Sequence, residues 1–150
     1  TVRAAGIPVE MVPGISSALA VPASMGIPLT HRKFASQVTI LTGNEDPTKP
    51  EPALDWKLLA QLRGTIVILM GVANLSKIAQ ALIENNKVAT TPVAVIERGL
   101  RRDRRITTGT LADIATKTKE AGVKPPAVIV IGDVVSLHEP DLMDLVPFEE

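Results

Sequence analysis

Two serines follow a Pro-Gly pair near the start of the chain, in the segment PGISSA at residues 13–18. The Pro-Gly pair is typical of the end of a strand, and Ser16 or Ser17 can cap a helix that begins there. The N–H groups and the dipole at a helix start can bind a carboxylate or another polar ligand group. The segment therefore predicts either a polar contact to a small ligand or an ordinary capped helix.

A methionine and a glycine follow two further apolar runs in a similar way. Met70 ends the run TIVILM and precedes Gly71, and Gly99 lies just past the run TPVAVIE. In open α/β sheets, ligands bind beyond the carboxyl ends of strands, where glycine permits close approach. Met70 and Gly99 are therefore candidate ligand contacts. The alternatives are that Met70 fills a gap in the core and that Gly99 serves only a turn.

Five arginines gather in ERGLRRDRR at residues 97–105. Arginine binds carboxylates and phosphates through paired hydrogen bonds, so Arg101 and Arg102 are candidate contacts to an acidic ligand. A solvated, charged turn is the alternative. His31 and Arg32, in the segment GIPLTHR, could point into a cleft, but a lone histidine in a loop is more often structural or exposed than catalytic.

Motifs for covalent or metal-dependent catalysis are missing from the sequence. It contains no cysteine and only two histidines, far apart, so we expect neither a disulfide framework nor a metal site. It has no serine, histidine and acid in a convincing context and no Gly-rich phosphate motif. The residues point to a small-molecule site built from backbone at strand ends and name no catalytic residue.

The elements that would position these residues alternate between strands and helices. Apolar runs rich in β-branched residues predict strands at 8–12, 37–42, 65–70, 91–97 and 127–135. Amphipathic patterns predict helices at 55–62, 74–86 and 110–122, with Asp55, Asn74 and Thr110 as N-caps. This alternation predicts an α/β fold with a mixed, mostly parallel sheet of about five strands and helices on both faces.

One connection in this alternation is too short for a crossover helix. The residues between Glu97 and Thr108 fit a hairpin, so we expect one antiparallel pair. The opening residues 1–7 read as the end of a helix that turns at Gly6. We therefore expect the chain to begin inside a larger arrangement.

Composition fits one ordinary globular domain. The 150 residues are 45% hydrophobic and 21% charged, with 16 acidic and 16 basic side chains. Zero net charge and 2% aromatic residues argue against a nucleic-acid surface. No apolar run approaches the roughly 18 residues of a membrane-spanning helix.

Taken together, the segments resemble the tetrapyrrole (corrin/porphyrin) methylase family. The stretch GIPVEMVPGISSALAVPASMGIPLTHR, the strand end LMG, the segment VAVIERG followed by RRITTGTLADIA, and PPAVIVIGDVV occur in the family in this order. The resemblance runs from about Ala5 to Leu137. The combination of PGISSA with GIPLTHR is typical of the uroporphyrinogen-methylating branch.

The resemblance implies an enzyme that transfers methyl groups from S-adenosylmethionine to two carbons of uroporphyrinogen III, giving precorrin-2 for siroheme or cobalamin. It also implies a cytoplasmic homodimer that needs no metal. Carried over by position, the donor contacts are Ser16, Ser17, Met70 and Gly99, with a further backbone contact near Pro126 or Ala127. Four residues are candidate partners of the polycarboxylate substrate, namely His31, Arg32, Arg101 and Arg102.

The resemblance also implies that residues 1–150 are the C-terminal domain of such an enzyme. The family's N-terminal domain, which holds its other donor loops and its proposed acid/base residues, is not in this sequence. We therefore expect half of a donor site and no turnover from these residues alone. Two alternatives stay open: a methylase of the same fold acting on a later corrin intermediate, diphthamide or ribosomal RNA, and a non-catalytic module that self-associates.

Overall fold

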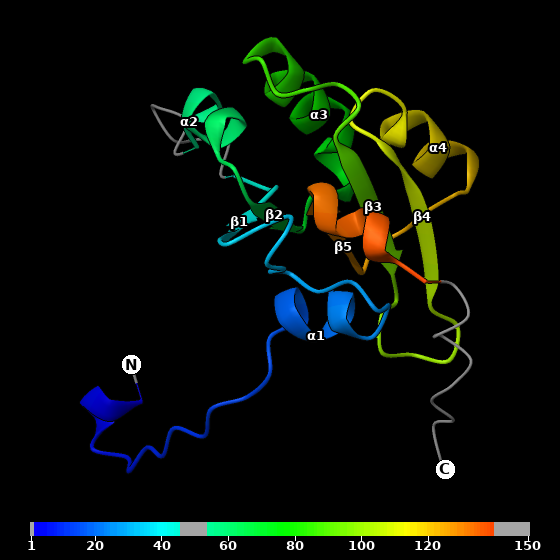
Figure 1. Ribbon diagram of the computed structural model, residues 1–150. Helices are drawn as coiled ribbons and strands as arrows, with labels where there is room; N and C mark the ends of the chain where they lie inside the picture. The colour runs from blue at the N-terminus through cyan, green and yellow to red at the C-terminus, as the bar shows by residue number, and fades with distance from the viewer. Residues whose placement is uncertain (1, 46–53, 140–150) are drawn as a thin grey trace.

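A computed structural model describes residues 2–45 and 54–139 of the chain (Figure 1). The strands are β1 (Val38–Thr42), β2 (Thr65–Leu69), β3 (Pro92–Glu97), β4 (Arg105–Thr110) and β5 (Ala127–Ile131). The α-helices are α1 (Ser17–Ala23), α2 (Trp56–Gln61), α3 (Leu75–Glu84) and α4 (Ile114–Glu120). Short 3-10 turns span Arg3–Ala5, Val72–Asn74 and Asp133–Leu137.

The five strands form one mixed sheet in the order β1-β2-β5-β3-β4. A mixed α/β sheet of five strands is confirmed, but the expected parallel majority is wrong. Only β1 and β2 pair in parallel, and the other three pairs are antiparallel. The predicted β3–β4 hairpin explains this, because it reverses the chain and the crossover through α4 keeps the reversed direction. Strand β5 therefore enters the centre of the sheet antiparallel to both neighbours.

Helices cover both faces of the sheet, as expected (Figure 1). Alternate strand residues, such as Ile66 and Ile68 of β2, face a core formed with α2, α3 and α4. The intervening Val67 faces a second core built by α1 and the Asp133–Leu137 turn. The central strands therefore have apolar residues on both sides, which is why they read as continuous apolar runs.

The helix starts confirm two of the predicted caps and correct two. Ser16 accepts a hydrogen bond from the Ala18 N–H at 3.2 Å, and Asp55 accepts one from the Leu58 N–H at 2.9 Å. Asn74 instead donates its side-chain N–H to the Gly43 carbonyl at 2.8 Å, which ties the end of β1 to the turn after β2. The fourth helix begins at Ile114 rather than Thr110, because Asp113 accepts the Thr110 N–H at 2.7 Å and holds a turn there.

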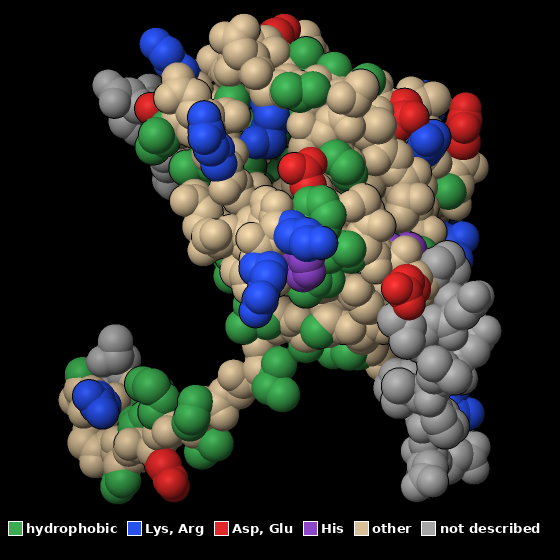
Figure 2. Space-filling model, viewed as in Figure 1, with side chains coloured by type: hydrophobic (Ala, Val, Ile, Leu, Met, Phe, Trp, Pro, Cys, Tyr) green, Lys and Arg blue, Asp and Glu red, His purple; other side chains and the backbone are tan. Residues whose placement is uncertain are grey.

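The predicted strand at residues 8–12 does not form. These residues are exposed and have no regular structure, and the segment before α1 projects away from the body (Figures 1 and 2). A strand requires a neighbour for its backbone hydrogen bonds, and no strand of the described residues pairs with it. Residues 3–5 do form a helical turn that ends at Gly6, as expected.

The last predicted strand, 127–135, ends early at Ile131. Gly132 has a φ of 142°, and residues Asp133–Leu137 turn into a 3-10 helix instead. Among the described residues, the longest helix is α3 with 10 residues, and no helix is long and apolar enough to cross a membrane.

Candidate functional site

A cavity lies at one end of the sheet, beyond the ends of the strands. The carboxyl ends of β1, β2 and β3 meet the amino end of β5 at this end, as the strand directions require. The cavity measures about 610 Å³, within the range of small-molecule sites. It is lined by Ser17, Val21, Asn44, Leu69, Met70, Val72, Ala73, Ile96, Arg98, Gly99, Arg101, Pro125, Pro126, Ala127 and Val128.

Three of the four predicted donor contacts line this cavity, although they are far apart in sequence. Ser17 comes from the start of α1, Met70 from the end of β2, and Gly99 from the turn after β3. Pro126 and Ala127, named as a further possible contact, line it too. Ser16 is not in the lining and acts as the cap of α1.

Met70 faces the cavity and is not a core residue. The residue is 65% exposed, and its backbone has a left-handed φ of 55°. That conformation is rare for a residue with a side chain, and such backbone strain clusters at ligand sites. The following Gly71 leaves no space for a Cβ atom, which would lie 2.8 Å from Ile129 Cδ1. The strand end therefore turns sharply and presents Met70 at the cavity rim.

Gly99 brings the turn after β3 against helix α1. A Cβ atom at this position would collide with both methyl groups of Val21. The residues on either side of Gly99 have left-handed backbone conformations, with φ of 51° at Arg98 and 68° at Leu100. A close approach and a tight turn thus expose main chain on this side of the cavity.

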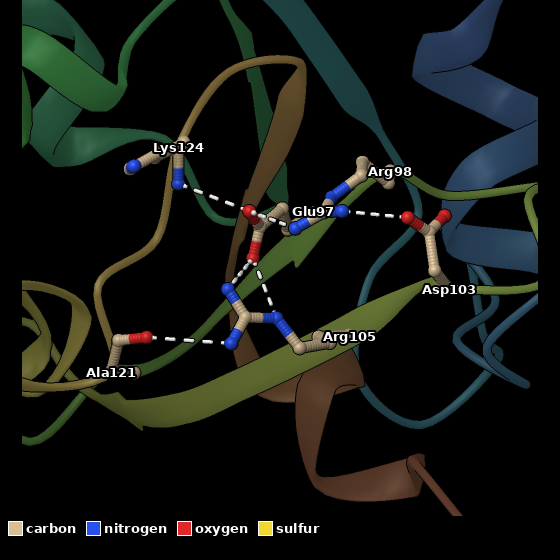
Figure 3. A network of polar contacts seen from close by, with 6 residues as sticks. All are labelled: Glu97, Arg98, Asp103, Arg105, Ala121 and Lys124. Atoms are coloured by element: carbon tan, nitrogen blue, oxygen red, sulfur yellow. Dashed lines mark hydrogen bonds and ion pairs between the residues drawn. The ribbon is translucent and has the colours of Figure 1, made fainter.

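An ion network with a buried carboxylate at its centre joins this turn to β3 and β4 (Figure 3). The Glu97 side chain is 1% exposed and accepts hydrogen bonds from Arg98 Nη2 at 3.1 Å and Arg105 Nε at 2.9 Å. Arg105 Nη2 and the Lys124 N–H, the latter at 3.2 Å, complete its contacts. Arg98 also donates to Asp103 at 2.6 Å.

The protonation of Glu97 follows from these contacts. Burial by itself would raise the pKa of this carboxyl, but the hydrogen bonds from Arg105, Arg98 and the Lys124 N–H outweigh it and hold the pKa below its ordinary value. Glu97 is therefore a carboxylate near neutral pH. The sequence motifs did not predict a role for Glu97, although its place as a charged residue at the end of an apolar strand, beside five arginines, is a usable signal.

The arginine run divides into different environments. Arg98 and Arg105 are committed to the Glu97 network, so they are not available as a separate anion site. Arg101 lines the cavity, whereas Arg102 is exposed and lies outside the lining. The run thus supplies two partners of the buried Glu97 carboxylate and one arginine of the cavity lining.

His31 and Arg32 lie apart from the cavity lining. His31 N–H donates to the Ala35 carbonyl at 2.8 Å, and its ring centroid lies 5.2 Å from that of Phe34. The His31 ring nitrogen Nδ1 accepts the Lys33 N–H at 3.3 Å. These contacts give His31 a local role in a tight turn, and the contact of either residue with a substrate stays a prediction.

Comparison with known proteins identifies the family. The sequence profile described as Tetrapyrrole (Corrin/Porphyrin) Methylases matches residues 1–115. The chain belongs to the tetrapyrrole methylase family.

The described residues hold no cluster of three or more histidine, cysteine, aspartate or glutamate side chains suited to a metal ion.

Individual relatives agree with the family. The chain is 59% identical over 130 residues to an S-adenosyl-L-methionine-dependent uroporphyrinogen III methyltransferase of Methanosarcina barkeri, covering 87% of this chain and 51% of the relative. It is 47% identical over 133 residues to a uroporphyrinogen-III C-methyltransferase of Methanocaldococcus jannaschii, covering 87% and 54%. The chain therefore spans about half the length of these tetrapyrrole methylases.

A solved tetrapyrrole methylase has the same fold. The uroporphyrin-III C-methyl transferase of Thermus thermophilus, complexed with S-adenyl homocysteine, superposes with a TM-score of 0.74 at 30% identity. The match covers 91% of this chain and 57% of that protein.

Proposed function

We propose that this chain supplies one side of the donor site in a methyltransferase that uses S-adenosylmethionine to methylate uroporphyrinogen III. The carrying observation is that Ser17, Met70 and Gly99 line a single cavity at the strand ends. The names of relatives 59% and 47% identical support this substrate over a later corrin, diphthamide or RNA. Precorrin-2 for siroheme or cobalamin would be the product.

The cavity suits such a donor in shape and chemistry. Apolar side chains such as Leu69, Ile96 and Val128 cover much of its lining, and main chain is exposed beside Gly99. S-adenosylmethionine supplies an electrophilic methyl group on a sulfonium, which needs orientation and exclusion of water more than activation. The residues of this chain are therefore assigned to binding and orientation.

The substrate carries many carboxylates, and we assign one contact with them to Arg101. This arginine lines the cavity, and no hydrogen bond joins its guanidinium to the part of the chain that the structure describes. Arg102, His31 and Arg32 lie outside the lining. Their substrate contacts stay secondary parts of the proposal.

Donor binding can be tested on the chain itself by NMR. We expect S-adenosylhomocysteine at millimolar concentration to shift the backbone amide signals of Met70, Gly99 and Ala127, and to leave those of α4, which lies away from the cavity, unchanged. NMR detects weak binding, as expected for half of a site. Unshifted signals at these three residues would overturn the donor-site proposal. We expect no turnover from these 150 residues alone.

Substrate binding can be tested with uroporphyrin III, measured by quenching of its fluorescence. Arg101→Gln should weaken binding roughly three- to tenfold, because a charge-assisted hydrogen bond to a carboxylate is lost. Lys119→Gln removes one exposed positive charge on α4, outside the cavity, and is the control, with an expected change below about twofold. Equal effects would indicate unspecific charge attraction and would contradict the Arg101 contact.

We also propose that the chain self-associates as a homodimer. Several apolar side chains before α1 are exposed, including Met11 and Ile15, each at 86%. Such a segment favours burial against a partner. Sedimentation velocity over a range of concentrations measures the mass directly, and a constant monomer mass would contradict self-association. A cytoplasmic location stays a prediction.

A further inference from the structure

Glu97 stands immediately behind the proposed donor cavity without being part of its lining. Its carboxylate is buried at the end of β3, between two lining residues, Ile96 and Arg98. A buried carboxylate is costly unless cations and hydrogen bonds surround it. The position therefore calls for a reason beyond filling space.

The hydrogen bonds of Glu97 connect the segments that form two walls of the cavity (Figure 3). Through Arg98 it holds the turn that contains Gly99 and Arg101. Through the Lys124 N–H it holds the loop that leads into Pro125 and Pro126. A backbone hydrogen bond from the Arg98 N–H to the Pro126 carbonyl, at 2.9 Å, joins the same two walls.

The charges within the network itself cancel, whereas Arg101 lines the cavity outside the network. Two cations, Arg98 and Arg105, face two anions, Glu97 and Asp103, and Arg98 contacts both anions. The proposed donor is itself a cation, because its sulfur carries three carbon substituents. An unbalanced positive charge behind the wall would repel this sulfonium more than it would affect the neutral thioether product.

We propose that Glu97 is a positioning residue that joins the two cavity walls and neutralises the arginines behind them, so that the cavity accepts a cationic sulfonium ligand. The inference rests on the proposed donor site. It assigns no contact between Glu97 and the donor. Its distinctive consequence is a change in the preference for S-adenosylmethionine over S-adenosylhomocysteine when the charge of the network changes.

The test measures dissociation constants of both compounds by NMR titration of the chain at neutral pH. Glu97→Gln leaves the network with one excess positive charge, so the affinity ratio should move toward S-adenosylhomocysteine by roughly three- to tenfold. Both affinities should also fall, because the two walls lose their shared anchor. An unchanged ratio would overturn the proposal, whether or not the two affinities fall.

For a second variant we expect the affinity ratio to change in the opposite direction. Arg105→Gln removes a half-exposed cation that does not line the cavity, and the ratio should then move toward S-adenosylmethionine. This keeps the proposal open to refutation if Glu97→Gln fails to fold. Shifts of the ratio in the same direction in both variants would indicate general loosening and would overturn the electrostatic role.

Asp113→Asn is the matched control. This substitution also removes one negative charge and an ion pair, here the 2.7 Å contact with Lys117. Asp113 lies before α4 and outside the cavity lining. We expect the affinity ratio to stay within about twofold of the original. If the unmodified chain does not bind S-adenosylhomocysteine, the proposed function itself is refuted. This outcome differs from an unchanged affinity ratio, which refutes only the role of Glu97.

Discussion

At the scale of single residues, the cavity depends on the missing side chain of Gly99. Because a Cβ at this position meets Val21, Gly99→Ala forces the turn and α1 apart. We expect a loss of about 1–3 kcal/mol in the free energy of unfolding, measured by urea denaturation, together with weaker S-adenosylhomocysteine binding. In the proposed donor site, Gly99 would thus serve both packing and ligand binding.

Two further variants check that explanation. Val21→Ala should partly restore the stability of Gly99→Ala, because the two sites are coupled through one contact. Gly14→Ala is the control, since a Cβ there meets nothing within 4 Å, and we expect a change within about 0.5 kcal/mol. An additive double variant would argue against the collision with Val21.

At the scale of elements, the Glu97 network makes the attachment of the β3–β4 hairpin sensitive to acid. The pKa of Glu97 is lower in the folded chain than its ordinary value of 4.5, so the unfolded state takes up the proton first. Its contribution to stability is complete above about pH 4.5 and is lost as the pH falls through the folded-state pKa. The hairpin should therefore loosen in acid.

Urea midpoints measured from about pH 7 to about pH 3 test this sign. We expect the midpoint of the unmodified chain to fall more steeply below about pH 4.5 than that of Glu97→Gln, which has no such proton to gain. The variant keeps Asp103 and Asp113, whose pKa values are also lowered, by hydrogen bonds chiefly from Arg98 and Lys117 respectively, so some acid sensitivity remains. Parallel pH profiles would contradict the role of Glu97.

The sequence predicted elements better than their directions. Continuous apolar runs identified β2 and β3, because burial on both faces leaves no polar alternation to confuse the pattern. The direction of β5 was missed, although the predicted hairpin already required a reversal. Local caps were right where the side chain had no competing partner, as at Ser16 and Asp55. They were wrong at Asn74, whose amide binds Gly43 instead.

For the site too, features that depend on local sequence were predicted better than features that depend on contacts between distant segments. The resemblance to the family selected Ser16, Ser17, Met70 and Gly99, and all of these except Ser16 line one cavity. Residue types alone could not separate a ligand contact from a core methionine or an ordinary turn. The sequence did not predict the role of Glu97, because that role depends on partners from segments that meet only in the folded chain.

At the scale of the whole molecule, the segment before α1 is set apart from the rest. Its exposed apolar residues include Met11 and Ile15. We expect thermolysin, which cuts beside large apolar residues, to cleave between residues 7 and 15 well before it attacks the sheet. Mass spectrometry of the products identifies the sites.

Protein concentration distinguishes the two states proposed for this segment. In dilute solution the segment should be cut rapidly, and protection that grows with concentration would support its burial in a homodimer. Initial cleavage within β2 or β3 would contradict the arrangement, since these strands are buried on both faces.

The central place of β5 has a consequence for how the chain acquires its shape. Strands β1 and β2 form one ladder and β3 and β4 another, and β5 is the strand that pairs with both. The two ladders are thus joined by backbone pairing only through residues 127–131. Met70 comes from one ladder and Gly99 from the other. The cavity is therefore complete only when β5 has paired with both ladders, so its two sides depend on contacts that are distant in sequence.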